Sequence, residues 1–150
     1  MPISFVNDTL DKEILEALQA QLSTNLPWAK KVEVDKVIVA YDQAEYDTPY
    51  IQAFDNGQKL RHERARLVVK WSVIVELCIK ENINSTFNQG DLLTYRQQIE
   101  QAIGSDVTLG GKVINVLYLG NHSDIGLLRP NLISQQVFEI EYHKPYTGVC

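Results

Sequence analysis

The residue types of a hydrolytic triad stand together in one short segment of this 150-residue sequence, Asn121-His122-Ser123-Asp124. In a working triad the nucleophile, base and carboxylate form a relay of side chains, normally assembled from positions far apart in the chain. Adjacent residues point in different directions, and the sequence lacks the G-x-S-x-G turn that exposes the serine of many hydrolases. We therefore predict no catalytic residue here. A loop with local hydrogen bonds between side chains and backbone is the simpler interpretation.

Metal and phosphate chemistry are the next possibilities. A structural zinc site takes four ligands, whereas His62, His122 and His143 lie on separate predicted elements. The acidic residues between positions 42 and 55 do not follow the spacing of a calcium loop. The Gly-Gly-Lys run at residues 110–112 follows a predicted helix and precedes a strand, so no helix N-terminus would face a phosphate there. The sequence predicts neither a metal site nor a cofactor.

The remaining charged residues form a basic cluster and an acidic loop. The cluster consists of Lys59, Arg61, Arg64 and Arg66, and the loop carries Asp42, Glu45 and Asp47. Trp71 follows the cluster, but the interleaved aromatic residues expected for stacking on bases are missing. The net charge of −5 also argues against a dedicated nucleic-acid binder. We favour a salt-bridged contact between the cluster and the acidic loop of a neighbouring subunit, so these seven residues are candidate intersubunit contacts.

Composition places the chain among soluble globular proteins. It is 45% hydrophobic and 22% charged, and its length suits one domain over residues 1–150. Cys78 and Cys150 lack the spacing of a metal or redox motif, which favours reduced thiols and a reducing cytoplasm. The first residues do not resemble a signal peptide, and the apolar runs fall far short of the ~20 residues that span a bilayer. We expect a cytoplasmic protein without membrane contact.

Hydrophobic periodicity predicts two helices and five strands. Apolar residues recur at helical spacing from Leu10 to Leu22, and again from Leu92 to Ile103 before Gly104. Alternation predicts strands at residues 31–41, 50–54, 66–80, 113–119 and 138–142. The predicted fold is α+β, a mixed or antiparallel sheet of about five strands with two helices packed on it.

Two connections complete the predicted fold. Asp55-Asn56-Gly57 is a tight-turn signal, and the polar residues 59–66 before the long strand indicate an exposed β-hairpin arm that projects from the sheet. The segment 120–134 contains Gly, Asn, Asp and Pro, which predicts an excursion over the surface.

The order of elements in the second half resembles one protein family. An amphipathic helix, the run D-x-T-L-G-G at residues 106–111 and the apolar strand 113–119 follow one another, and residues 138–142 fit a closing strand. In this order the segment is similar to the tail terminator, or tail completion, proteins of long-tailed bacteriophages and prophages. The resemblance covers roughly residues 88–143.

The resemblance implies a structural virion protein rather than an enzyme. Subunits of that family form a ring, usually of six, that caps the tail tube, ends its polymerisation and docks the head connector. The implied partners are therefore further copies of the chain, the tail tube protein and the head-tail connector, with DNA only in passage through a channel. The implied location is the host cytoplasm during assembly and then the tail or neck of the virion.

Two other functions fit the same sequence. Another head-tail connector or neck protein would share the size and class, and native mass and position in the particle would separate it from a terminator. A small ligand-binding or hydrolytic α+β domain would use residues 120–134 as a lid, and a deep apolar pocket beside His122 and Asp124 would be its sign.

Overall fold

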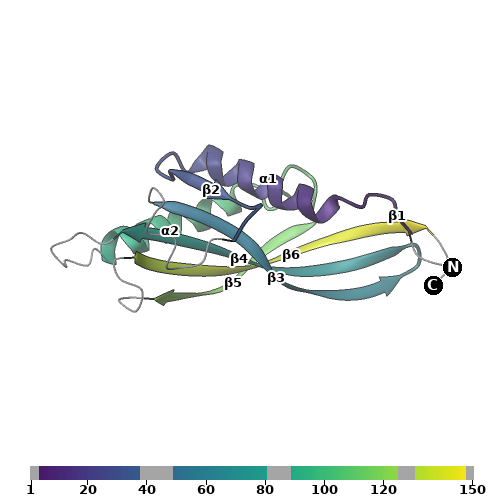
Figure 1. Cartoon of the computed structure of the whole chain (residues 1–150). Coiled ribbons are helices and arrows are strands. Elements are labelled where there is room, and N and C mark those ends of the chain that lie inside the picture. Colours follow the sequence, from purple (N-terminus) through teal and green to yellow (C-terminus); the bar gives the residue numbers. More distant parts are fainter. Residues whose placement is uncertain (1–3, 38–48, 81–88, 125–130, 148–150) are drawn as a thin grey trace.

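The chain has an α+β fold with two helices and a curled mixed sheet (Figure 1). The computed structural model describes residues 4–37, 49–80, 89–124 and 131–147. The helices are α1 (Leu10–Asn25) and α2 (Gln89–Gly104). The strands are β1 (Ser4–Phe5), β2 (Lys31–Glu33), β3 (Tyr50–Glu63), β4 (Arg66–Lys80), β5 (Asn115–Asp124) and β6 (Asn131–Thr147).

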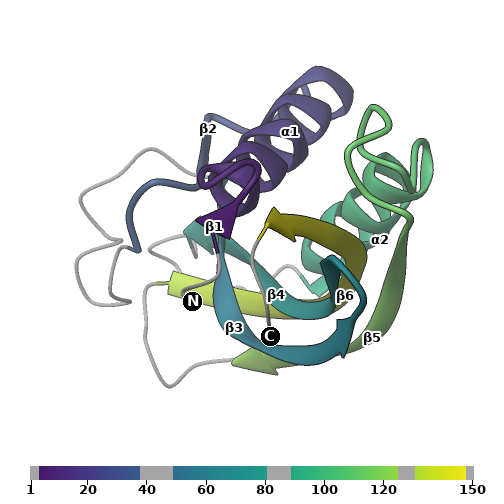
Figure 2. The ribbon, with the colours of Figure 1, turned by 90° about the vertical axis from the view of Figure 1, so that its right-hand side faces the viewer.

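Strand β6 organises the sheet because it pairs along both of its edges. One edge pairs antiparallel with β4 over the whole length of β4. The other edge is shared, since β5 pairs with its first part and β1 with its end. Strand β3 continues the antiparallel order beyond β4, and β2 adds three residues parallel to the start of β3. Figure 2 shows how the resulting sheet curls beneath the helices.

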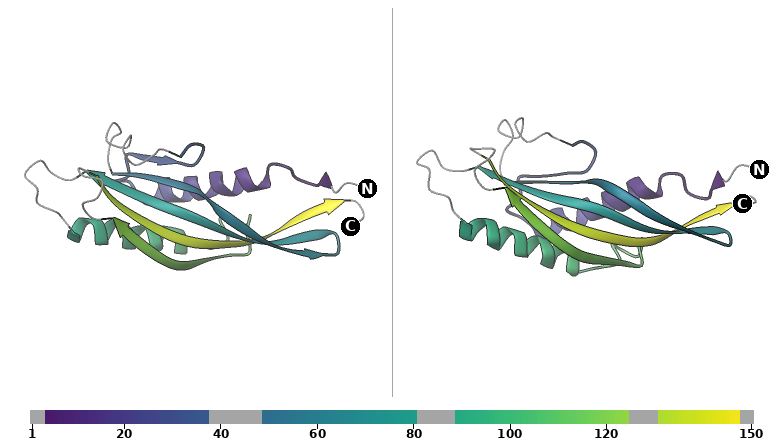
Figure 3. Two further views of the ribbon diagram at one scale, coloured as in Figure 1. Left: turned by 60° about the horizontal axis from the view of Figure 1, so that its bottom comes forward. Right: turned by 90° about the horizontal axis from the view of Figure 1, so that it is seen from below.

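Both helices lie over one side of the sheet, here called the helix side (Figures 1 and 3). Residues of odd number in β4 face this side, and Trp71 among them is only 3% exposed, as the alternation predicts. The buried residues of the two helices pack on this side of β4. They are Ile14, Leu18 and Leu22 of α1 and Leu92, Ile99, Ala102 and Ile103 of α2. The opposite side, the far side, has a small buried cluster of its own at Tyr50, Cys78 and Ile133.

The tight turn predicted at residues 55–57 is wrong. Strand β3 continues through this segment with a β-bulge between Asp55 and Gln58, and Gly57 has a φ of +99°. A glycine at positive φ suits a bulge as well as a hairpin turn, so the local signal does not distinguish them. The chain reverses instead after Glu63, with Ala65 at a φ of +67°.

Strand β6 holds this turn in place. The Tyr146 amide donates to the Ala65 carbonyl at 3.1 Å, and the Tyr146 hydroxyl donates to the Glu63 carbonyl at 2.9 Å. Residues 59–63 are consequently a paired part of β3, in register from Lys59↔Lys70 to Glu63↔Arg66. They are not an irregular connection.

Two other predicted boundaries are also corrected. Residues 120–124 belong to β5 and residues 131–134 to β6, so most of the expected surface excursion is paired strand. An edge strand tolerates polar residues because it is solvated, and a register shift between Tyr118 and Gly120 accommodates the glycine. The strand expected over residues 31–41 is the short β2, and residues 38–41 lie outside the described ranges.

Candidate intersubunit surface

The basic cluster lies at the end of the sheet formed by residues 58–70 and 142–146, here called the hairpin end. Trp71 faces the helix side, so Lys70 faces the far side, and its cross-strand partner Lys59 faces the same way. Arg61 and Arg66 also face the far side by alternation, and Arg64 lies in the turn. The four residues of the cluster are exposed. The fold therefore places three of them on the far side of the sheet and Arg64 in the adjoining turn.

Two of the four cations have an ion-pair partner in the same chain. Glu63 accepts from Arg61 Nη2 at 3.0 Å and from Arg66 Nε at 2.8 Å. The hydrogen bond from Arg66 is the main cause that holds the pKa of Glu63 below its usual value. Lys59 and Arg64 form no ion pair with any residue in the described ranges. They are the cations best placed to bind an acidic surface elsewhere.

The acidic half of the predicted contact cannot be placed in the same way. Asp42, Glu45 and Asp47 all lie outside the described residues. Asp55, from the same region of sequence, is exposed at the β-bulge, where it accepts from the Trp71 indole at 2.7 Å and from the Gly57 amide at 2.8 Å. In the described structure, Asp55 therefore fastens the β-bulge of β3 to Trp71 of β4.

The first turn of α1 is joined to the hairpin end by Asp11. Its carboxylate accepts from the Tyr142 hydroxyl at 2.6 Å, from Lys144 Nζ at 2.7 Å and from Gln58 Nε2 at 3.2 Å. Burial by itself would raise the pKa of Asp11, but the hydrogen bonds from Lys144 and Tyr142 and the charge of Lys144 outweigh it, so the pKa is lowered. Burial, followed by the bond to Asp11, raises the pKa of Tyr142.

Sequence reasoning missed this network. Asp11 and Tyr142 are 131 residues apart, and no local pattern connects them. The only available signal is that Tyr142 and Lys144 share one side of a strand and Asp11 stands in the first turn of a helix.

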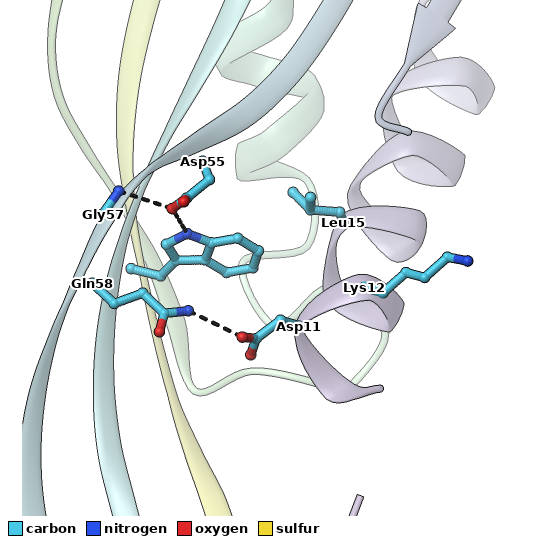
Figure 4. A pocket seen from close by; sticks show the side chains of 7 residues that line it. Asp11, Lys12, Leu15, Asp55, Gly57 and Gln58 are labelled. Atoms are coloured by element: carbon cyan, nitrogen blue, oxygen red, sulfur yellow. Dashed lines mark hydrogen bonds between the residues drawn. The ribbon is translucent and has the colours of Figure 1, made fainter. Parts of the chain in front are cut away.

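A pocket of about 380 Å³ opens beside this network, between α1 and the β-bulge (Figure 4). It is lined by Asp11, Lys12, Leu15, Asp55, Gly57, Gln58 and Trp71. The carboxylates of Asp11 and Asp55 are each hydrogen-bonded to neighbouring side chains, and Figure 4 shows the bond between Asp11 and Gln58 across the pocket. The polar groups of the pocket thus serve mainly to fasten the helix and the bulge to the sheet.

The triad-like tetrapeptide is divided between the two sides of the sheet. Arg96 of α2 donates to Asn121 Oδ1 at 3.1 Å and to Ser123 Oγ at 3.4 Å, so these two residues face the helix side. His122 stands between them on β5 and points to the far side. Ser123 and His122 are therefore not positioned as a nucleophile and its base. The described ranges also contain no group of three or more His, Cys, Asp or Glu side chains that could hold a metal ion.

The D-x-T-L-G-G run forms a tight turn whose conformation depends on its side chains. Asp106 accepts from the amide and hydroxyl of Thr108 and from the Gly110 amide. These hydrogen bonds, with that from the Thr108 hydroxyl the largest, lower the pKa of Asp106. Gln21 of α1 binds the same region by donating to the carbonyls of Ala102, Ile103 and Asp106. The turn thus fixes the end of α2 against α1.

Replacing Gly110 or Gly111 by alanine is expected to lower the free energy of unfolding by roughly 1–2 kcal/mol, the cost of placing a Cβ in the left-handed region. Their φ angles are +72° and +85°, and open space surrounds both. Gly104→Ala is the matched control, because Gly104 ends α2 without a positive φ. The control should be neutral or stabilising by up to about 1 kcal/mol. Urea denaturation of the three variants tests this, and equal losses in all three would contradict it.

Neither described helix is long and apolar enough to cross a membrane. A scan against protein-family models and a search of curated proteins both returned no match for this chain.

Proposed function

We propose that this chain is a structural virion protein, a ring-forming subunit similar to phage tail terminators. In this role it caps the tail tube, stops its polymerisation and docks the head connector. The observation that best supports the proposal is the hairpin end, where β3, β4 and β6 continue past α1 and present exposed cations (Figure 1). We propose that this end is the arm through which one subunit grips the next.

The mechanism of such a cap is geometric. A head-to-tail contact between identical subunits closes into a ring when the rotation between neighbours divides a full turn. The closed ring has two different faces, one for the tail tube and one for the head connector. Growth of the tube ends because the face that points away from the tube differs from the end of the tube, so no further tube subunit can bind to it.

Charge is expected to set the register of the arm. Exposed ion pairs contribute ~0.2–1 kcal/mol each and weaken as salt screens them. Lys59 and Arg64 lack an ion pair within the described ranges, so a neighbouring acidic surface is the partner we propose for them. Asp42, Glu45 and Asp47 of the adjacent subunit remain the candidates for that surface.

Sedimentation of the purified protein over a range of concentrations, with and without tail tubes purified from the same source, tests the proposal. The wild type is expected to reach the mass of a closed ring. Lys59→Glu with Arg64→Glu should shift the population towards monomer and reduce or reverse the weakening of the ring by salt, while the melting temperature stays the same. Lys30→Glu with Lys112→Glu changes the charge equally at exposed positions elsewhere and should leave the ring intact.

Two results would count against the proposal in different ways. A wild type that stays monomeric at every concentration, even with tail tubes, would contradict the function itself. A ring that persists in the Lys59 and Arg64 variant would show that these cations of the arm do not contribute to the contact between subunits.

A further inference from the structure

The sheet has an open apolar edge at β5. Within the described residues β5 pairs only with β6, so the backbone groups along its other side have no strand partner (Figure 3). The run from Val113 to Leu119 contains no charged residue and no proline. Four of its side chains are unusually exposed, namely Ile114 at 49%, Leu117 at 49%, Tyr118 at 38% and Leu119 at 54%. Proteins normally protect such an edge with charges, proline or a covering segment, which indicates that something covers this one.

A second open edge lies on the opposite margin of the sheet, at β3. Strand β2 pairs only with the first three residues of β3. Within the described ranges, residues 53–63 therefore have no strand partner on the edge that faces away from β4 (Figure 3). Leu60 in this stretch is 52% exposed and faces the helix side, because its partner Val69 belongs to the core. Lys59 and Arg61 face the far side.

The two edges match in strand direction. Strands β5, β6, β4 and β3 lie in this order and each is antiparallel to the next. The row has four strands that alternate in direction, so its outer strands β5 and β3 run in opposite directions. A second copy placed beside the first in the same orientation therefore brings its β3 antiparallel to β5 of the first. The helices of both copies then lie on the same side of one continuous sheet. Leu60 of one copy and Tyr118 of the other face that side together.

The two edges also match in charge. Glu139 and Glu141 of β6 lie one strand in from β5, and both face the far side, where Leu117 and Asn115 are their cross-strand partners on β5. Lys59 and Arg61 occupy the far side at the β3 edge, where Arg61 is paired with Glu63 and Lys59 forms no ion pair within the described ranges. Pairing β5 with β5 would bring the glutamates of two copies together, and pairing β3 with β3 would bring the cations together. The head-to-tail pairing instead places Lys59 of one copy on the same side of the sheet as Glu139 and Glu141 of the other, two strands apart and within the range of a screened attraction.

We infer that β5 of one copy pairs antiparallel with residues 53–63 of β3 in the next copy, which makes a single sheet that runs around the ring. This inference rests on the proposed function, because it identifies the two surfaces by which the ring would close. The main-chain hydrogen bonds supply adhesion, and the apolar and charged side chains select one edge for the other. The occupant of each edge is a second copy of this chain.

Variants that block one edge at a time test the inference, because a head-to-tail contact uses two different surfaces. Leu117→Lys with Leu119→Lys blocks the β5 edge, and Leu60→Lys blocks the β3 edge. Each variant alone is expected to be monomeric where the wild type forms rings. Each buried leucine that is lost should raise the dissociation constant of the contact roughly 10- to 100-fold. An equimolar mixture should form a 1:1 dimer that cannot grow, since each partner keeps one intact edge. Leu93→Lys with Val107→Lys, also exposed apolar residues, is the control and should form rings.

The outcomes separate this inference from the proposed function. Rings in both edge variants, beside rings in the wild type, would overturn the edge pairing and leave the ring itself intact. Dimers in one variant alone, with no 1:1 complex in the mixture, would mean that like edges pair and would also overturn it. A wild type that never assembles would contradict both.

Hydrogen exchange gives a second measurement that does not depend on the variants folding. Amides of residues 115–119 and 59–63 should exchange more slowly in assembled wild type than in dilute monomer. Equal exchange rates in the two states would overturn the inference.

Discussion

Replacing Trp71 by alanine is expected to lower the free energy of unfolding by about 3–5 kcal/mol, the range for truncating a large buried aromatic side chain. Trp71 packs on the helix side of β4 among core residues and contacts Tyr142, with ring centroids 6.1 Å apart. Its indole also donates to Asp55 at 2.7 Å, so the truncation would loosen the β-bulge as well as leave a cavity.

The control is Trp71→Phe, which keeps an aromatic ring in the core but removes the hydrogen bond to Asp55. The bond itself contributes about 1 kcal/mol, so this variant should lose clearly less stability than the alanine variant. Urea denaturation at neutral pH measures both changes. A stability of Trp71→Ala indistinguishable from that of the wild type would mean that this side of β4 is not interior.

Replacing Asp11 by alanine is expected to lower the free energy of unfolding by about 1–3 kcal/mol, because it leaves the buried Tyr142 hydroxyl and the half-buried Lys144 ammonium without their shared acceptor. The side chain of Asp11 is 38% exposed, so water compensates part of the loss. Asp8→Ala removes an exposed carboxylate just before α1 and should change stability by less than about 0.5 kcal/mol.

The effect of Asp11 should depend on pH with a definite sign. The folded state lowers the pKa of this carboxyl, so its contribution is complete above the unfolded value of about 4 and is lost as the pH falls through the folded value. The difference in stability between the wild type and Asp11→Ala should therefore shrink on going from pH 7 to pH 3. A difference that stays constant, or grows on acidification, would contradict the role of the ionised carboxylate.

Periodicity predicted the parts of the fold that repeat along the chain. The stripe of Ile14, Leu18 and Leu22 and the alternation around Trp71 both place the core correctly, because each follows from burying one side of an element. The α+β class follows from the same patterns. These signals are local, and a single sequence contains them in full.

Features that depend on distant partners could not be predicted in the same way. Gly57 gave a turn signal, but pairing of residues 59–63 with β4 extended the strand and made the glycine part of a bulge. The segment 120–124 appeared to be a loop because it is polar, yet β6 supplied a partner along its edge. In the candidate contact surface, Glu63 forms ion pairs with two of the four predicted cations, and alternation along β3 could have indicated the pair with Arg61.

The central position of β6 has a consequence for how the protein folds. Strands β3 and β4 are joined by a short turn and can pair early, whereas β6 must find β4 although fifty residues separate the two strands in sequence. Until it does, the edge of β4 that β6 will occupy is open, although β5 can already pair with β6 because the two strands are close in sequence. Docking of β6 is therefore expected to be the slow step of folding. A chain that meets another copy before this step could exchange β6 with it, so correct assembly requires that the monomer completes its own sheet first.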